Sequence, residues 1–202
     1  MFVRKLQEKE KEQIIEIGRQ IFREEDEIPL LKKALSLCST DLSFVAVDNS
    51  EIVGFTLVCS KTHTNYYFNF MRQIPNCYEF AFLGIAPCAQ GKGLGTRLLK
   101  ETLEAIFQSS AKPFTCWLLV DTINEGAIRL YEKIGFRCWR KTLPPLTPLP
   151  GYIMGIHSRK LFKNIFSRQK QQYPQQHKHL YHINHIQQLQ NIPYNTTYAV
   201  IV

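Results

Sequence analysis

Long apolar runs are missing from this sequence. None reaches the roughly 18 uncharged residues that a membrane-spanning helix requires, so we expect no such span. Residues 1–6 pass directly into the charged stretch 8–12, which is not the pattern of a signal peptide. The remaining composition, with 45% hydrophobic and 12% aromatic residues, is typical of a globular protein with one proper core.

Closely spaced cysteines are also missing. The six cysteines form no Cys-x-x-Cys pair and lie mostly inside apolar runs, so scattered buried thiols are a better interpretation than disulfides or zinc. We therefore expect a reducing, cytoplasmic compartment. Four histidines at positions 177, 179, 182 and 185 have no Cys or acidic residue nearby, so we expect no metal site there either.

Acidic residues are absent from the last third of the chain. The net charge is +8, yet no Asp or Glu follows Glu132. The last 70 residues carry ten Lys or Arg, whereas the first 132 hold 15 basic and 17 acidic residues. A basic C-terminal part suits cofactor phosphates, a nucleic acid or an anionic membrane surface, and charge alone does not choose among them.

The apolar patterns predict one α/β (α+β) domain. Strands are expected at residues 2–6, 42–47, 52–59, 78–86, 114–120, 136–141 and 152–157, and helices at 8–22, 29–37, 94–107 and 124–133. This order predicts a mixed sheet with helices on both faces. Residues 61–76 show no clear period, and we expect a loop there whose aromatic side chains pack on the domain.

The character of the chain changes near residue 159. We predict a domain at residues 1–158 and a basic, Gln- and His-rich extension at 159–202. Within the extension, residues 160–170 have the spacing of a short basic amphipathic helix. Such a helix is able to contact a nucleic acid or a membrane surface, although packing on the domain is the more ordinary outcome.

The segment with the clearest chemistry is the glycine-spaced loop at residues 90–95, between a predicted strand and a predicted helix. A helix N-terminus offers unpaired N–H groups and partial positive charge, and glycines let the backbone approach an anion closely. Lys92 and Arg97 add positive charge. The spacing G-x-G-x-G fits neither the dinucleotide fingerprint nor the P-loop, but it fits Q/R-x-x-G-x-G/A through Gln90, Gly93 and Gly95.

Over residues 1 to about 158 the sequence resembles the GNAT acetyltransferases. The stretch EFAFLGIAP at 79–87, followed by QGKGLG at 90–95, is similar to motif A of that family, and NEGAIRLYEKIGF at 124–136 is similar to motif B. The resemblance implies a GNAT-like, mostly antiparallel sheet and acetyl-CoA as co-substrate. It assigns acetyl-CoA binding to Leu83, Gly84, Ile85, Gln90, Gly91, Lys92, Gly93, Leu94, Gly95, Thr96 and Asn124.

Two residues are the candidates for proton transfer. Tyr131 matches the motif B tyrosine, which in many family members reaches the CoA sulfur, and is the candidate acid. Glu79 matches the catalytic glutamate of the histone-acetyltransferase branch and is the candidate base. Many N-terminal acetyltransferases of the family instead use a glutamate on the fifth strand, and this chain has Leu119 at that position.

The sequence does not identify the acceptor. The resemblance predicts direct transfer of an acetyl group to a primary amine, on a protein or a small molecule. The acidic patch at 24–27 would suit a cationic amine, or is simply a solvated helix end. Two alternatives remain open. One is a non-catalytic acyl-CoA-binding module with a basic partner-recruiting tail, and the other is a nucleic-acid-associated protein that works through its C-terminal third.

Overall fold

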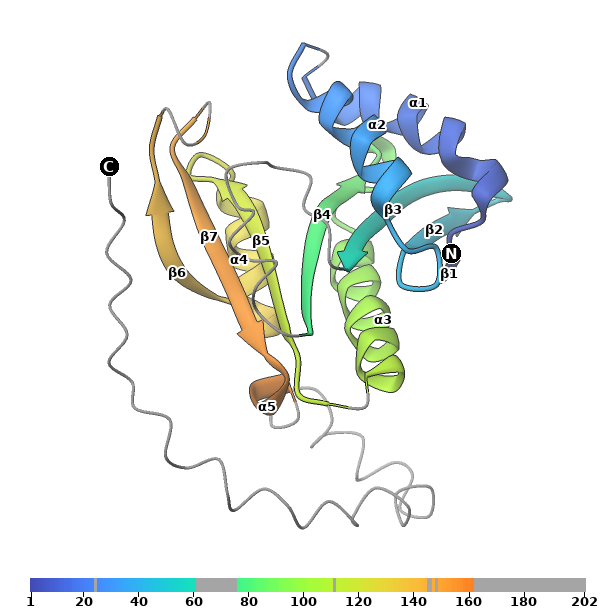
Figure 1. Ribbon diagram of the computed structural model, residues 1–202. Coiled ribbons are helices and arrows are strands. Elements are labelled where there is room, and N and C mark those ends of the chain that lie inside the picture. The colour runs from blue at the N-terminus through green and yellow to red at the C-terminus, as the bar shows by residue number, and fades with distance from the viewer. Residues whose placement is uncertain (24, 61–75, 111, 145–146, 148, 162–202) are drawn as a thin grey trace, which may run out of the picture. The chain divides into compact units, whose positions relative to one another are not determined.

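The computed structural model describes residues 1–23, 25–60, 76–110, 112–144, 147 and 149–161. Seven strands form one sheet in the order β1-β2-β3-β4-β5-β7-β6 (Figure 1). The strands are β1 Phe2–Lys5, β2 Phe44–Asp48, β3 Glu51–Ser60, β4 Cys77–Ile85, β5 Thr115–Asp121, β6 Arg137–Thr142 and β7 Gly151–His157. The helices are η1 Glu8–Glu10, α1 Lys11–Ile21, α2 Glu27–Leu37, η3 Pro87–Ala89, α3 Leu94–Ser109, α4 Glu125–Ile134 and α5 Ser158–Leu161.

Helices cover both faces of the sheet, as the sequence predicted. On one face, called here the α1–α2 face, side chains of α1 and α2 pack on β2, β3 and β4 around Phe55 and Leu57. On the other, the α3–α4 face, α3 and α4 share a core with β5 and β7 that includes Leu99, Leu118 and Met154. The mixed, mostly antiparallel sheet is therefore confirmed.

The predicted order of strands and helices is also correct, and the differences lie at element ends. The helix expected at 8–22 is divided into η1 and α1, and its break follows the capping box between Gln7 and Glu10. The second helix begins at Glu27 rather than at Pro29. A proline is tolerated there because the first-turn N–H groups of a helix have no intrahelical partner.

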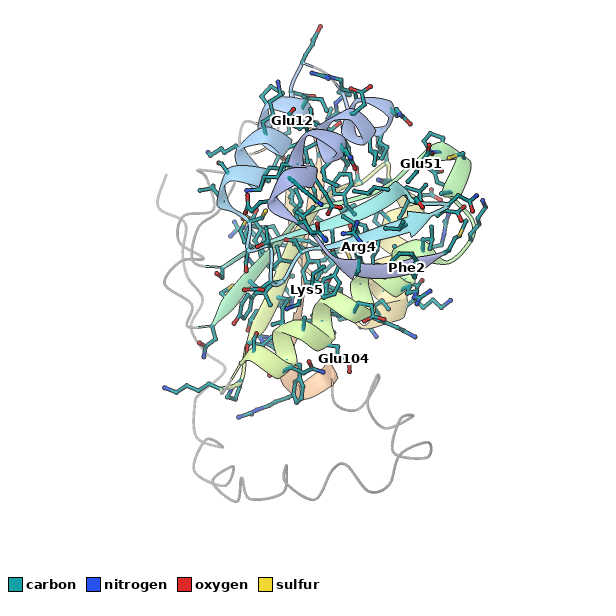
Figure 2. The ribbon with its side chains drawn as sticks, turned by 90° about the vertical axis from the view of Figure 1, so that its right-hand side faces the viewer. Phe2, Arg4, Lys5, Glu12, Glu51 and Glu104 are labelled. Carbon is teal, nitrogen blue, oxygen red and sulfur yellow. The ribbon has the colours of Figure 1, made fainter. Side chains whose placement is uncertain are left out.

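Strand β1 forms one edge of the sheet and leads into the first helical layer. Figure 2 looks onto this edge, with Phe2, Arg4 and Lys5 on β1. Arg4 Nη1 donates to Glu10 Oε2 over 2.9 Å, and the same oxygen accepts from the Gln7 backbone N–H. The Arg4 hydrogen bond lowers the pKa of the Glu10 carboxyl below its usual value. The pair thereby fixes the direction in which α1 leaves the sheet.

All neighbouring strands are antiparallel except β4 and β5, which are parallel. β4 and β5 pair only from Cys77 opposite Thr115 to Glu79 opposite Trp117. Beyond that point β4 continues its pairing with β3, and β5 continues with β7. The two strands therefore separate, and the sheet has a gap between the second part of β4 and the second part of β5.

A bulge lies in β4 where this separation begins. Leu57 of β3 faces Phe82 and Val58 faces Phe80, so Ala81 is an extra residue in β4. Ala81 and Phe82 both pack on the α1–α2 face, whereas Phe80 and Leu83 pack on the other. A bulge bends its strand and increases the local twist, and it is consistent with the divergence of β4 from β5.

None of the helices in the part of the chain that the structure describes is long and apolar enough to cross a membrane.

Candidate functional site

The gap between β4 and β5 leads directly to the glycine loop. Residues 80–85 of β4 form its one side, and their edge toward β5 makes no strand pairing. The chain then turns through η3 and the loop at 90–93 into α3. An unpaired strand edge and a helix N-terminus are thus joined within about ten residues. The first can pair with an extended ligand, and the second can bind an anion.

Two glycines of the loop are required by the backbone. Gly91 has φ +74° and Gly93, the N-cap of α3, has φ +76°, a region that L side chains rarely adopt. A Cβ atom at either position would meet nothing within 4 Å. The loop therefore presents its backbone to open space. The first three helical N–H groups, from Leu94 to Thr96, have no partner within the helix and are available to an anion.

The third glycine has a different role. A Cβ atom on Gly95 would lie 3.0 Å from Leu130 Cδ2 on α4, so Gly95 allows α3 to pack closely against α4. This contact joins the two motifs that the sequence resemblance identified. The glycines at 91 and 93 shape the loop, whereas Gly95 sets the distance between its helix and α4.

The side chains around the loop differ from one another in their use. Gln90 Nε2 donates to the Ile85 carbonyl over 3.1 Å and so ties the loop to the end of β4. Lys92 is exposed at the tip of the loop. Arg97, expected to supply positive charge to an anion, donates its Nη1 to the Met1 carbonyl over 3.3 Å. In this arrangement Arg97 ties α3 to the N-terminus, a contact that a single sequence does not reveal.

Glu79 lies at the last paired position of β4, directly before the gap. It is buried, with 5% of its surface exposed, among the strands of the α1–α2 face. Tyr78 and Phe80 pack with the α3–α4 core, and side chains alternate along a strand, so Glu79 points to the opposite face. Its negative charge and the burial together raise the pKa of the Cys77 thiol to about 12. Glu79 is thus a buried carboxyl group at the closed end of the gap.

Tyr131 lies on the other side of the sheet, in α4. Its ring is buried and packs against Phe136 at a centroid distance of 5.8 Å, and Phe136 packs against Phe80 of β4 at the same distance. Burial raises the pKa of the Tyr131 phenol well above its usual value, so the hydroxyl stays protonated at neutral pH. It can donate a hydrogen bond but not act as a base.

Glu79 and Tyr131 therefore flank β4 from opposite faces. An acceptor that enters from the α1–α2 face meets the carboxyl group first, and a leaving group on the α3–α4 side meets the phenol. Such a division suits a reaction in which one group must lose a proton and another must gain one.

Asn124 has a structural task in addition to the binding role expected for it. It is the N-cap of α4, and its Oδ1 accepts a hydrogen bond from the Ala127 N–H over 3.1 Å. A capping Asn typically stabilises its helix by about 1 kcal/mol relative to Ala. This contact alone would explain the residue, and only the Nδ2 group is left by it for a ligand.

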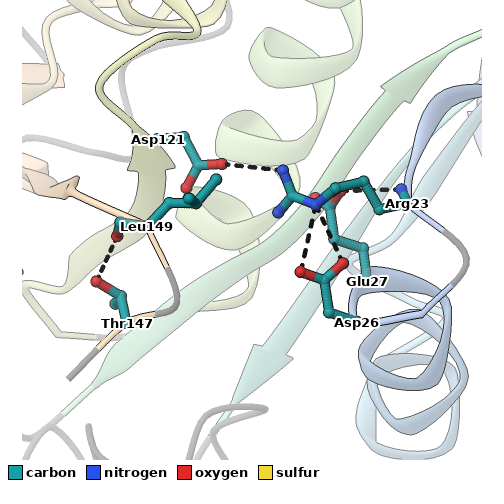
Figure 3. Close-up of polar contacts among 6 residues, drawn as sticks. All are labelled: Arg23, Asp26, Glu27, Asp121, Thr147 and Leu149. Atoms are coloured by element: carbon teal, nitrogen blue, oxygen red, sulfur yellow. Dashed lines mark hydrogen bonds and ion pairs between the residues drawn. The ribbon is translucent and has the colours of Figure 1, made fainter. Parts of the chain in front are cut away.

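One contact at the gap was not expected from the sequence. Arg23, at the end of α1, forms an ion pair with Asp121 at the end of β5, with 3.7 Å between Nη1 and Oδ2 (Figure 3). Arg23 also contacts Asp26 and Glu27 near the start of α2. The predicted acidic patch is therefore partly neutralised by a neighbouring arginine. Glu24, which belongs to that patch, lies outside the described residues.

Several predictions fall on residues that the structure does not describe. These are the aromatic loop at 61–75, the basic segment from residue 162 to 170, and the histidines of the extension. The boundary at residue 158 remains a prediction as well. Within the described ranges, no group of three or more His, Cys, Asp or Glu is placed to hold a metal ion.

Comparison with known proteins agrees with this geometry. The model of the acetyltransferase (GNAT) family matches residues 11–136. The N-alpha-acetyltransferase RimI of Mycobacterium tuberculosis is 38% identical over 66 residues, which are 33% of this chain and 39% of that protein. The matched part therefore spans less than half of this relative.

Solved structures show the same fold. The ribosomal-protein-S18-alanine N-acetyltransferase of Escherichia coli has a TM-score of 0.59 at 18% identity and covers 77% of this chain and 92% of its own. Arabidopsis thaliana Naa50, in complex with the bisubstrate analogue CoA-Ac-MVNAL, has a TM-score of 0.58 at 20% identity, with 77% and 97% covered. At these identities the likeness concerns the fold alone.

The family match includes the whole of the gap, the glycine loop and α4. It covers more than half of the chain and joins the two motifs in the order found here. The chain belongs to the GNAT family of acetyltransferases.

Proposed function

We propose that this protein transfers the acetyl group of acetyl-CoA to a primary amine by direct attack within a ternary complex. The observation that carries the proposal is the continuous path from the unpaired edge of β4 to the glycine loop at the start of α3. An extended pantetheine arm would pair with residues 83–85, and a pyrophosphate would meet the amides at 90–96. Asn124 would offer its Nδ2 group to the same ligand.

The acceptor must first lose a proton. An amine with an ordinary pKa of about 10.4 is an ammonium ion at neutral pH and has no lone pair for attack. Glu79 is the proposed base and takes this proton directly or through a water molecule. The nitrogen then attacks the thioester carbonyl carbon, the C–S bond breaks, and the amide nitrogen releases its second proton.

The leaving thiolate must be stabilised. Tyr131 is proposed to donate a hydrogen bond to the sulfur as negative charge develops there. Because burial raises the pKa of this phenol above that of an ordinary thiol of about 8.5, the phenol stabilises the thiolate mainly as a hydrogen-bond donor. The product CoA thiol takes up one of the protons that the amine releases.

The cysteines support direct attack over a covalent acetyl-enzyme. Burial raises the pKa of the Cys59, Cys77 and Cys116 thiols above their ordinary values, so they are protonated at neutral pH and are poor nucleophiles. Cys88 and Cys138 are exposed, and neither lies on the strand edge that lines the gap.

The test is a binding measurement followed by an acceptor screen. Calorimetry with acetyl-CoA should give saturable binding, and mass spectrometry should detect acetylation of at least one amine in a panel of free N-termini, lysine peptides and polyamines. The similarity to N-terminal acetyltransferases makes peptide N-termini the first acceptors to test. Absence of any acetyl-CoA binding would contradict the proposal at its base.

A second candidate is a non-catalytic acyl-CoA-binding module. Leu119 favours it, because that strand-five position carries a catalytic carboxylate in many N-terminal acetyltransferases and holds an apolar side chain here. Saturable acetyl-CoA binding without transfer to any acceptor would support this second function and contradict the first.

A further inference from the structure

Arg23 forms the visible part of an arch over the gap on the α1–α2 face. The preceding residue, Phe22, packs edge-on against Phe82 of β4 with 5.2 Å between ring centroids, and against Phe55 of β3 at 6.3 Å. Arg23 then reaches Asp121 at the end of β5. Phe22 is thus anchored on one side of the gap and Arg23 on the other.

The arch is held in place from α2. The Arg23 N–H donates to Glu27 Oε2 over 3.0 Å, and Arg23 Nε donates to both carboxylate oxygens of Asp26 over 3.1 and 3.2 Å. These bonds orient the guanidinium group toward Asp121 before any ligand is present (Figure 3). Leu149, from the connection between β6 and β7, lies beside Asp121 in the same view.

Asp121 lies on the same face as Glu79. Along β5, Cys116, Leu118 and Val120 pack in the α3–α4 core, so the alternate positions 117, 119 and 121 face the α1–α2 side. The arch therefore crosses the side of the gap on which the proposed base is placed.

An opening of limited length remains on this face. It is bounded at one end by the last β4–β5 pair, Glu79 with Trp117, and at the other by Asp121. The four residues from 117 to 121 span roughly 13 Å at about 3.3 Å per residue. Side chains of the flanking strands reduce this length further, so the opening suits a slender group rather than a bulky one.

We propose that the Arg23–Asp121 arch is a specificity-determining element that restricts the bulk of the acceptor able to reach the gap. This inference rests on the proposed acetyl transfer. Arg23 acts as a positioning residue and takes no part in the chemical step. The pair is partly exposed, with 48% and 31% of the two side chains accessible, so it resists a bulky acceptor without excluding it absolutely.

The kinetic test uses two acceptors of equal charge and different bulk. Two peptides with free N-termini that differ only in a first residue of glycine or tryptophan form such a pair, as do ethylamine and benzylamine among small amines. In R23A and in D121A, the ratio of kcat/KM for the bulky acceptor to that for the slender one should rise about two- to five-fold. Effects of this size are typical of an exposed ion pair.

The controls separate the arch from general effects. R129A removes an exposed arginine paired with Glu125 on α4 at 2.9 Å, away from the arch, and should leave the ratio unchanged. R23K keeps the charge and should lie between the wild type and R23A. The apparent KM for acetyl-CoA should stay unchanged in R23A, because Arg23 does not touch the glycine loop.

A second measurement does not depend on activity. Thermal unfolding of R23D, D121R and the charge-swapped double variant should show coupling, with the double variant more stable than the sum of the single effects predicts. An unchanged acceptor ratio in R23A and D121A, or additive effects in the cycle, would overturn the inference. A wild type that acetylates no amine would instead contradict the proposed function, and the unfolding cycle would then decide whether the arch exists.

Discussion

The two ends of β4 use one strand in opposite ways. Residues 77–79 pair with β3 on one side and β5 on the other, and their side chains are largely buried. Residues 80–85 pair with β3 alone and leave their other edge to the gap. The first end holds the two halves of the sheet together, and the second exposes backbone to a ligand.

The difference shows how a binding edge arises without a loss of sheet order. A bulge at Ala81 turns the strand at the point where pairing with β5 stops, and β5 stays in register with β7 throughout. Both strands therefore keep one neighbour. The catalytic candidate Glu79 lies at the border, where a rigid position meets the open space that the chemistry requires.

Thiol chemistry offers the largest contrast between the two ends. Cys77 lies in the closed end and has a thiol pKa raised to about 12, whereas Cys88 is exposed just beyond the open end. At pH 8 only about one Cys77 thiol in 10⁴ is ionised, and its burial slows access further. We expect iodoacetamide to modify Cys88 at least about 10³-fold faster than Cys77, measured by peptide mass spectrometry. Denatured protein, in which both should react alike, is the control.

The border residue Glu79 should affect turnover strongly. E79Q removes the proposed base but keeps the shape of the side chain, and general base catalysis typically contributes about 10²- to 10⁴-fold. We expect kcat to fall at least about 10²-fold at pH 7, with acetyl-CoA affinity preserved in calorimetry. The defect should shrink as the pH rises toward the amine pKa, because the acceptor then loses its proton without help. A pH-independent defect would argue for a structural role.

Tyr131 tests the α3–α4 side of the open end. Y131F keeps the ring that packs on Phe136 and removes only the donor, so the melting temperature should change little. We expect kcat to fall about 10²-fold while the Kd for acetyl-CoA stays within a factor of about two. The same acceptor and acetyl-CoA assays measure both values. Turnover equal to that of the wild type would remove Tyr131 from the mechanism and leave it as a core residue.

The glycine loop that follows the open end should control acetyl-CoA affinity. In G93A the left-handed backbone at φ +76° becomes strained by roughly 1–2 kcal/mol, and the loop is expected to relax away from its shape. Calorimetry should show acetyl-CoA binding weakened about ten-fold. The matched control is G126A in the first turn of α4, where a Cβ atom meets nothing within 4 Å and no such strain arises. Equal losses in both variants would contradict a specific role for Gly93.

Much of this site could be predicted from the sequence. The glycines of the loop, the strand before it and the helix after it follow one another within about twenty residues, so local pattern and resemblance were enough to find them. Asn124 at the start of α4 and Gly135 at its end, with φ +116°, act as local helix boundaries in the same way. These features depend on neighbours in the chain, and such neighbours are visible in a sequence.

The bulge at Ala81 and the partner of Arg97 were not foreseeable. Residues 80–83 are apolar without interruption, so no alternation marks the place where the strand changes phase. Arg97 pairs with the carbonyl of a residue 96 positions away. Neither local propensity nor charge pattern carries information about such a contact.

The sequence by itself determined the order of strands and helices, the backbone freedom at the glycine loop and the membership of the family. Tertiary structure decided that β4 and β5 separate after Glu79, that Glu79 and Tyr131 lie on opposite faces of β4, and that Arg23 reaches Asp121. The physical reason is the range of the interactions. Backbone dihedrals and helix caps depend on adjacent residues, whereas register, facing and ion pairs across a gap depend on how distant segments pack together.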